Sequence, residues 1–75
     1  MDYNKAKKVA EEISKLMVGT CWINKSKNIA KITYVRENNV GGTGDYEIRV
    51  IFSGKLGGND EVNEFLNLYE KIDCP

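Results

Sequence analysis

The chain has 75 residues, of which 41% are hydrophobic and 29% charged, and it carries no net charge at pH 7. This length allows one small domain, placed over residues 1–75, and excludes a second core. The sequence contains no histidine, the commonest general base and metal ligand, so we expect no enzymatic activity, no cofactor and no metal site.

The first predicted element is a helix over residues 4–18. Its apolar side chains recur at steps of three and four residues from Ala6 to Met17, which is the spacing of one helical face. Asp2 or Asn4 can cap the start of this helix, and Gly19 is a suitable stop. The segment therefore predicts an amphipathic helix with one apolar face.

Three short β-rich segments follow, at residues 20–24, 28–36 and 45–53, and they predict a three-stranded antiparallel sheet. Alternation of apolar and polar residues places Val35 on the open face of this sheet. The same alternation assigns six residues to the covered face: Ile32, Tyr34, Tyr46, Ile48, Val50 and Phe52.

The stretch from Asn38 to Asp45 is rich in glycine, which is typical both of phosphate-binding loops and of hairpin loops. A phosphate-binding loop requires a following helix, whereas the residues that follow here alternate like a strand. The stretch therefore predicts a hairpin loop. Exposed loops often carry contacts, so Gly41, Gly42 and Gly44 are candidate partner-binding residues.

The last predicted element is a second helix, capped by Asn59 or Asp60. Five apolar residues follow at helical steps: Val62, Phe65, Leu66, Tyr69 and Ile72. The element order is thus α-β-β-β-α. We expect an α+β fold in which two helices pack on one face of a three-stranded antiparallel sheet.

The two cysteines and the single tryptophan raise the questions of cellular compartment and of an exposed docking patch. The polar start "MDYNKAKK" does not resemble a signal peptide, and no apolar run has membrane-spanning length, so we expect a cytoplasmic protein with free Cys21 and Cys74 thiols. Trp22 lies in the first predicted strand. It either joins the core or forms an exposed docking patch.

Charge is distributed unevenly along the chain. Basic residues dominate up to Arg36, and acidic residues dominate after it. This asymmetry indicates either an interaction surface or attraction between the two halves within the fold. For the first alternative, Asp60, Glu61 and Glu64 of the second helix are the favoured contacts with a basic partner surface.

In element order the chain resembles the double-stranded RNA-binding domain. In that family, helix 1 and the first inter-strand loop meet minor grooves of RNA, and a basic helix 2 meets phosphates. Here "NDEVNEFL" stands where that basic motif is expected, and its carboxylates repel phosphate. The resemblance implies an alternative nucleic-acid-binding function through five lysines: Lys5, Lys7, Lys8, Lys25 and Lys27.

The same element order is similar to that of some small inhibitors of CRISPR nucleases encoded by phages and mobile elements. This resemblance implies action by occupying a surface of a larger enzyme. We therefore expect a non-enzymatic protein-binding module that serves as an inhibitor or accessory factor. We expect no membrane among its partners. Nucleic-acid binding is the alternative.

Overall fold

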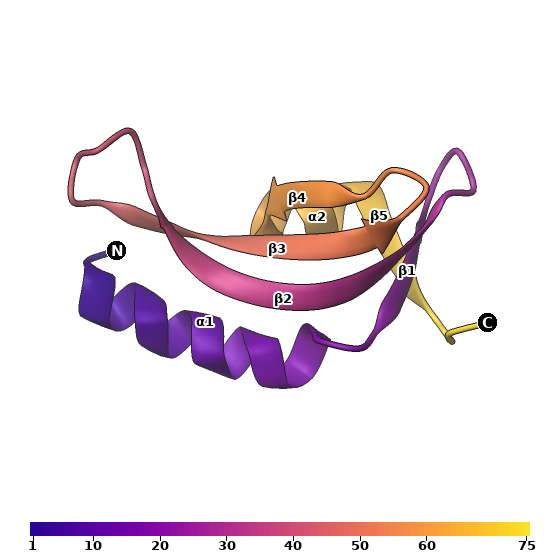
Figure 1. Cartoon of the computed structure of the whole chain (residues 1–75), viewed down its shortest axis with the longest axis horizontal. Coiled ribbons are helices and arrows are strands. Elements are labelled where there is room, and N and C mark those ends of the chain that lie inside the picture. The colour runs from indigo at the N-terminus through magenta and orange to yellow at the C-terminus, as the bar shows by residue number, and fades with distance from the viewer.

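The computed structural model describes all residues from 1 to 75 (Figure 1). It confirms the α+β class but not the number of strands, because the sheet has five strands instead of three. The elements in chain order are α1 (Tyr3–Met17), β1 (Cys21–Asn24), β2 (Ile29–Asn39), β3 (Tyr46–Gly54), β4 (Gly58–Glu61), α2 (Val62–Leu68) and β5 (Tyr69–Ile72).

All five strands belong to one antiparallel sheet with the order β4-β3-β2-β1-β5. Strands β1 to β4 are neighbours in chain order, as short connections favour. Helix α2 then carries the chain from one edge of the sheet to the other, where β5 pairs with β1 and Lys71 lies opposite Trp22. The observed element order is α-β-β-β-β-α-β, with two strands more than predicted. The resemblance in element order to the double-stranded RNA-binding domain and to the small inhibitors therefore does not hold.

Helix α1 agrees with its prediction. The Asp2 side chain caps it by accepting a hydrogen bond of 2.8 Å from the backbone N–H of Lys5. Gly19 follows the helix with a φ of +87°, a conformation that glycine adopts without steric cost. The helix packs on β2 and β3 along the lower side of the sheet in Figure 1.

The second helix is shorter than predicted, and both missed strands flank it. Strand β4 has the sequence "GNDE", whose residue types are depleted in strands, yet it pairs with β3 and places Asp60 opposite Val50. The helical spacing continues to Ile72, but the chain leaves the helix after Leu68 because β5 pairs with β1. Tertiary pairing here overrides a local helical pattern.

A β-bulge in β2 changes which side chains of that strand face the core. The register with β3 shifts between Ile32 and Tyr34. As a result Tyr34 is 57% exposed and Val35 only 5% exposed, the reverse of the predicted alternation. Strand β3 has no such irregularity on its own side, and its predicted inward residues Ile48, Val50 and Phe52 are buried.

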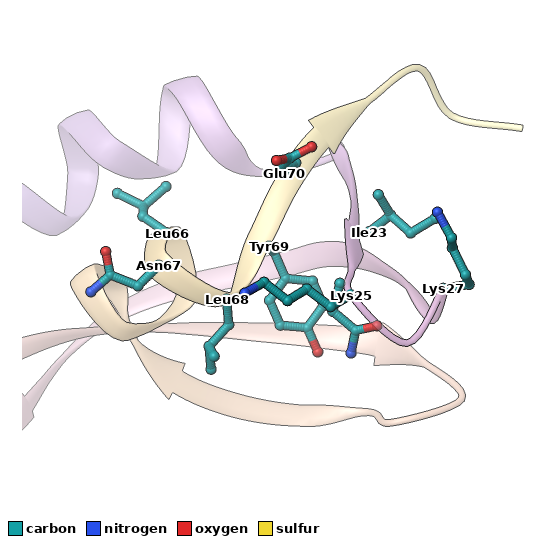
Figure 2. A pocket seen from close by; sticks show the side chains of 9 residues that line it. Ile23, Lys25, Lys27, Leu66, Asn67, Leu68, Tyr69 and Glu70 are labelled. Carbon is teal, nitrogen blue, oxygen red and sulfur yellow. The ribbon is translucent and has the colours of Figure 1, made fainter.

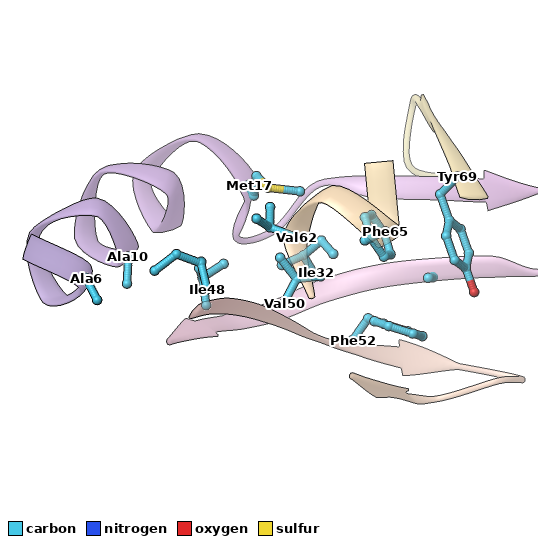
Figure 3. Packing of buried hydrophobic residues seen from close by; sticks show 12 residues of the cluster. Ala6, Ala10, Met17, Ile32, Ile48, Val50, Phe52, Val62, Phe65 and Tyr69 are labelled. Carbon is cyan, nitrogen blue, oxygen red and sulfur yellow. The ribbon is translucent and has the colours of Figure 1, made fainter. Parts of the chain in front are cut away.

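Both helices contribute to one core (Figure 3). Ala6, Ala10 and Met17 of α1 join Val62 and Phe65 of α2 above the buried side chains of β2 and β3. Trp22 lies at the edge of this core and does not form an exposed docking patch. Its ring packs edge-on against Phe65, and its Nε1–H donates a hydrogen bond of 2.8 Å to the Thr20 hydroxyl, so Trp22 belongs to the margin of the core.

The expectation of two free thiols was wrong, because Cys21 and Cys74 form a disulfide. Pairing of β5 with β1 places Ile72 opposite Cys21, so Cys74 arrives beside it with 5.1 Å between the two Cα atoms. The predicted helix up to Ile72 gave no reason to expect Cys74 beside Cys21, because it contained no strand paired with β1. No helix of the chain is both long enough and apolar enough to cross a membrane.

Candidate functional site

Helix α2 has a buried apolar face, but its solvent-facing side is not wholly polar. Glu61 caps it by accepting hydrogen bonds from the backbone N–H groups of Asn63 and Glu64. Val62 and Phe65 face the core, and Phe65 stacks on Tyr69 with 4.4 Å between ring centroids. The remaining side of a surface helix usually carries polar residues, but here it also carries leucine.

The turn between β1 and β2 lies beside the end of α2. The Asn24 side-chain oxygen organises this turn by accepting hydrogen bonds of 3.0 Å from the backbone N–H groups of Ser26 and Asn28. Lys27 adopts a φ of +66° to complete it. An ordered turn of this kind presents Lys25 and Lys27 from defined backbone positions.

Two adjoining recesses lie between α2 and this turn, with volumes of about 400 Å³ and about 350 Å³. Five residues line both recesses, and we call the combined feature the α2 groove: Asn24, Lys25, Asn67, Leu68 and Tyr69. The first recess, shown in Figure 2, is completed by Ile23, Lys27, Leu66 and Glu70. The second is completed by Ser26, Leu56 and Asp60.

Three leucines at the α2 groove are exposed to solvent. The exposed fractions are 51% for Leu56, 48% for Leu66 and 58% for Leu68. Single exposed leucines are common on protein surfaces, but neighbouring ones around a recess are typical of interaction sites. They come from two separate parts of the chain, the β3–β4 connection and α2, and only the fold brings them to one groove.

Polar groups without partners inside the chain also reach the groove. The ion pairs of the chain involve neither Lys25 nor Lys27. Tyr69 is only 7% exposed and lines both recesses, yet its hydroxyl takes part in no hydrogen bond within the chain. Figure 2 shows its ring in the middle of the lining residues.

The acidic residues favoured from sequence occupy three different environments. Asp60 lies in β4 and lines the second recess of the α2 groove. Glu61 is engaged as the cap of α2, and Glu64 is exposed in the first turn of the helix. Only Asp60 therefore reaches the groove, and a change at Glu61 also disturbs the helix.

The glycine loop lies at the other end of the long axis of the molecule, beside the N-terminus (Figure 1). Gly41, Gly42 and Gly44 all have positive φ, and the predicted hairpin between β2 and β3 is confirmed. The Met1 ammonium donates a hydrogen bond to the Asp45 carboxylate. This hydrogen bond, together with the attraction of the ammonium charge, lowers the pKa of the Asp45 carboxyl from its ordinary value of 3.8.

The five lysines of the nucleic-acid alternative do not form one surface. Lys5, Lys7 and Lys8 lie together on α1, on a shallow surface that also includes Asp2, Asn4 and Glu11. Lys25 and Lys27 belong to the α2 groove. The molecule measures 37 Å along its longest axis, and α1 begins at the end opposite the β1–β2 turn (Figure 1).

The three leucines and Tyr69 are not predicted as site residues by the sequence pattern. The helical spacing places Leu66 and Tyr69 on the apolar stripe of a long helix, which implies a structural role. Leu68 lies outside that stripe, and Leu56 stands alone in a glycine-rich connection. An apolar residue outside the predicted core is the signal that points to both of them.

Comparison with known proteins finds no matching family model, no significantly similar curated protein and no significantly similar solved structure. No group of three or more cysteine, aspartate or glutamate side chains lies close enough together to hold a metal ion.

Proposed function

We propose that this protein is a non-enzymatic binding module that acts by occupying the surface of a partner protein, with the α2 groove as its contact region. The observation that supports the proposal is the group of Leu56, Leu66 and Leu68, each exposed beside the groove. Asp60 remains part of the proposed contact region, whereas the glycine loop lies outside it.

The energetic argument rests on apolar area. Covering the exposed half of one leucine side chain contributes about 1 kcal/mol, so three of them supply several kcal/mol before the costs of association. Lys25 and Asn67 surround this apolar centre with polar groups. An apolar centre with a polar rim is the usual anatomy of a protein–protein interface.

A role as an inhibitor or accessory factor, including one encoded by a phage or mobile element, belongs to the same proposal. Such a protein needs one surface that covers a functional region of its partner and needs no chemistry of its own. The lack of histidine fits this requirement.

The disulfide bears on where the protein works. Cytosolic thiol systems keep most cysteines reduced, whereas extracellular and periplasmic proteins retain disulfides. A cytoplasmic site of action therefore requires that the protein function with the Cys21–Cys74 bond open, or that the fold protect this bond from reduction. An oxidising compartment requires neither condition.

The test compares two leucine substitutions of the same kind at different places. Wild-type protein, Leu68→Asp and Leu16→Asp are immobilised, and proteins are captured from an extract of the organism that encodes the chain. Leu68 and Leu16 are both exposed, so both variants should fold, which circular dichroism checks. The captured partner is purified, and its dissociation constant is measured by calorimetry.

We expect Leu68→Asp to weaken the purified interaction at least about tenfold and Leu16→Asp to leave it unchanged. Equal affinity of both variants would remove the α2 groove from the proposal. Fluorescence anisotropy with labelled RNA and DNA tests the alternative. Saturable, salt-sensitive binding that is lost when Lys5, Lys7 and Lys8 are changed to glutamate would replace protein binding with nucleic-acid binding.

A further inference from the structure

Charged side chains are arranged along the α2 groove in a definite order. Lys25 lines both recesses and therefore stands at the middle of the groove. Asp60 lines only the recess on the Leu56 side, and Glu70 lines only the recess on the Leu66 side. Lys27 adds a second positive charge to the Leu66 side. The middle of the groove is thus cationic, and one carboxylate lies toward each end.

A largely buried side chain with a hydrogen-bonding group, Tyr69, also lines both recesses. Tyr69 is the first residue of β5, and its ring stacks on Phe65 of α2 and contacts Phe52 of β3, with ring centroids 5.7 Å apart in the second case. The Tyr69 residue lines both recesses, and its hydroxyl forms no hydrogen bond within the chain. A phenolic O–H can donate to a carboxylate, which is an acceptor only.

The exposed leucines lie on both sides of this polar centre. Leu56 belongs to the second recess, Leu66 belongs to the first, and Leu68 lines both. A segment that covers all three must carry apolar side chains on either side of the group that meets Lys25. Spacing of this kind is provided by one face of an amphipathic helix, with apolar residues three or four positions apart.

We propose that the α2 groove binds an amphipathic helical segment of a partner protein that places a carboxylate against Lys25 and the Tyr69 hydroxyl, between leucine-type side chains that cover Leu56, Leu66 and Leu68. This inference rests on the proposed function and adds the chemistry of the partner. Lys25 carries its charge without an ion-pair partner inside the chain, so a carboxylate there completes an ion pair without breaking one.

The test uses two synthetic helical peptides of about four turns each. Both carry leucine at positions i, i+3 and i+7, and they differ at one position between the leucines, which is glutamate in one peptide and lysine in the other. Each is titrated into ¹⁵N-labelled protein while the backbone amide resonances are followed. The proteins compared are wild type, Lys25→Glu and Lys7→Glu, which makes the same charge change on α1.

We expect the glutamate peptide to shift the amide resonances of residues 23–27 and 66–70 in wild type and in Lys7→Glu. Lys25→Glu should weaken this binding about tenfold and strengthen binding of the lysine peptide. Equal binding of both peptides at these residues, unaffected by Lys25→Glu, would overturn the carboxylate preference and leave the groove as a docking site. Shifts elsewhere, or none with either peptide, would overturn the inference, while the Leu68→Asp comparison still decides the proposed function.

Discussion

Gly54 ends β3 at a position that excludes any other residue. Its φ is +135°, and a Cβ atom added there would lie 2.2 Å from the backbone oxygen of Ile29 on the neighbouring strand. The Ile29 backbone cannot move away without breaking the pairing of β2 with β3, since Ala30 lies opposite Gly54 in the register. This glycine allows β2 and β3 to stay paired up to the β1–β2 turn.

Gly54→Ala should therefore lower the free energy of unfolding by more than about 2 kcal/mol. Gly58→Ala is the matched control, because the added Cβ would lie 3.7 Å from its nearest neighbour, an ordinary contact. Urea unfolding followed by tryptophan fluorescence measures both variants. A loss as small in Gly54→Ala as in Gly58→Ala would contradict the close approach of the two strands.

The Asp45 carboxyl provides a pH test at the N-terminal end of the molecule. Because its pKa is lowered in the folded state by the Met1 ammonium, its contribution to stability is present above the unfolded-state pKa and is lost as the pH falls through the folded-state pKa. The destabilisation caused by Asp45→Asn should therefore be visible at pH 6 and disappear in strong acid. The side chain is exposed, so the effect should be small.

An NMR titration of the Asp45 carboxyl measures the pKa itself. The reference is the same chain with an acetylated N-terminus, which removes the ammonium charge. Acetylation should raise the Asp45 pKa toward its ordinary value of 3.8. An unchanged pKa after acetylation would show that the ammonium is not its cause.

Among the secondary-structure elements, the sequence predicts correctly those in which residue propensities and hydrophobic periodicity indicate the same structure. Helix α1 has an apolar face, a cap at Asp2 and a stop at Gly19, and its observed bounds differ by one residue from those expected. The β2–β3 hairpin was predicted by the alternation in β3 and by the glycines that precede it. In these segments local propensity and tertiary packing favour the same structure.

The elements that sequence did not predict are those that long-range pairing creates. Strand β4 has no strand-forming residue, and β5 lies within a continuous helical pattern, so only pairing with β3 and β1 defines them. The bulge between Ile32 and Tyr34 and the exposed leucines of the α2 groove have the same origin. Each depends on which segments meet in space, and a single periodic pattern carries no such information.

The disulfide should stabilise the arrangement of β5. Strand β5 lies at a sheet edge and consists of only four residues, and Cys74 follows it and ties the end of the chain to β1. A small domain has limited core, so a covalent link matters more than in a large one. The two cysteines are separated by 53 residues, so closing the loop restricts the unfolded chain considerably.

Reduction should lower the free energy of unfolding by about 2–4 kcal/mol. Chemical unfolding with and without dithiothreitol measures the change, and mass spectrometry confirms that the bond has opened. The Cys21→Ala/Cys74→Ala double variant is the control and should not respond to the reductant. Free thiols in the purified protein, or unchanged stability after verified reduction, would contradict the role given to this link.

At the scale of the whole molecule, the two ends of the long axis have different characters. One end carries the glycine loop, Met1 and the lysines of α1, and the other carries the α2 groove (Figure 1). The one ion pair that joins the basic half to the acidic half is that of the Met1 ammonium with Asp45, and no ion pair joins a lysine of α1 to an acidic residue of β4, α2 or β5. The charges of α1 and α2 therefore face solvent independently.

Hydrogen exchange of the protein with and without its purified partner tests most directly whether the partner binds at the α2 groove. Exchange reports where backbone amides become protected, so it separates one end of the molecule from the other. We predict slower exchange in the complex at residues 23–27 and 66–70, with no change at residues 41–44 or 5–8. Protection confined to the glycine loop or to the start of α1, with the α2 groove unchanged, would contradict partner binding at the α2 groove.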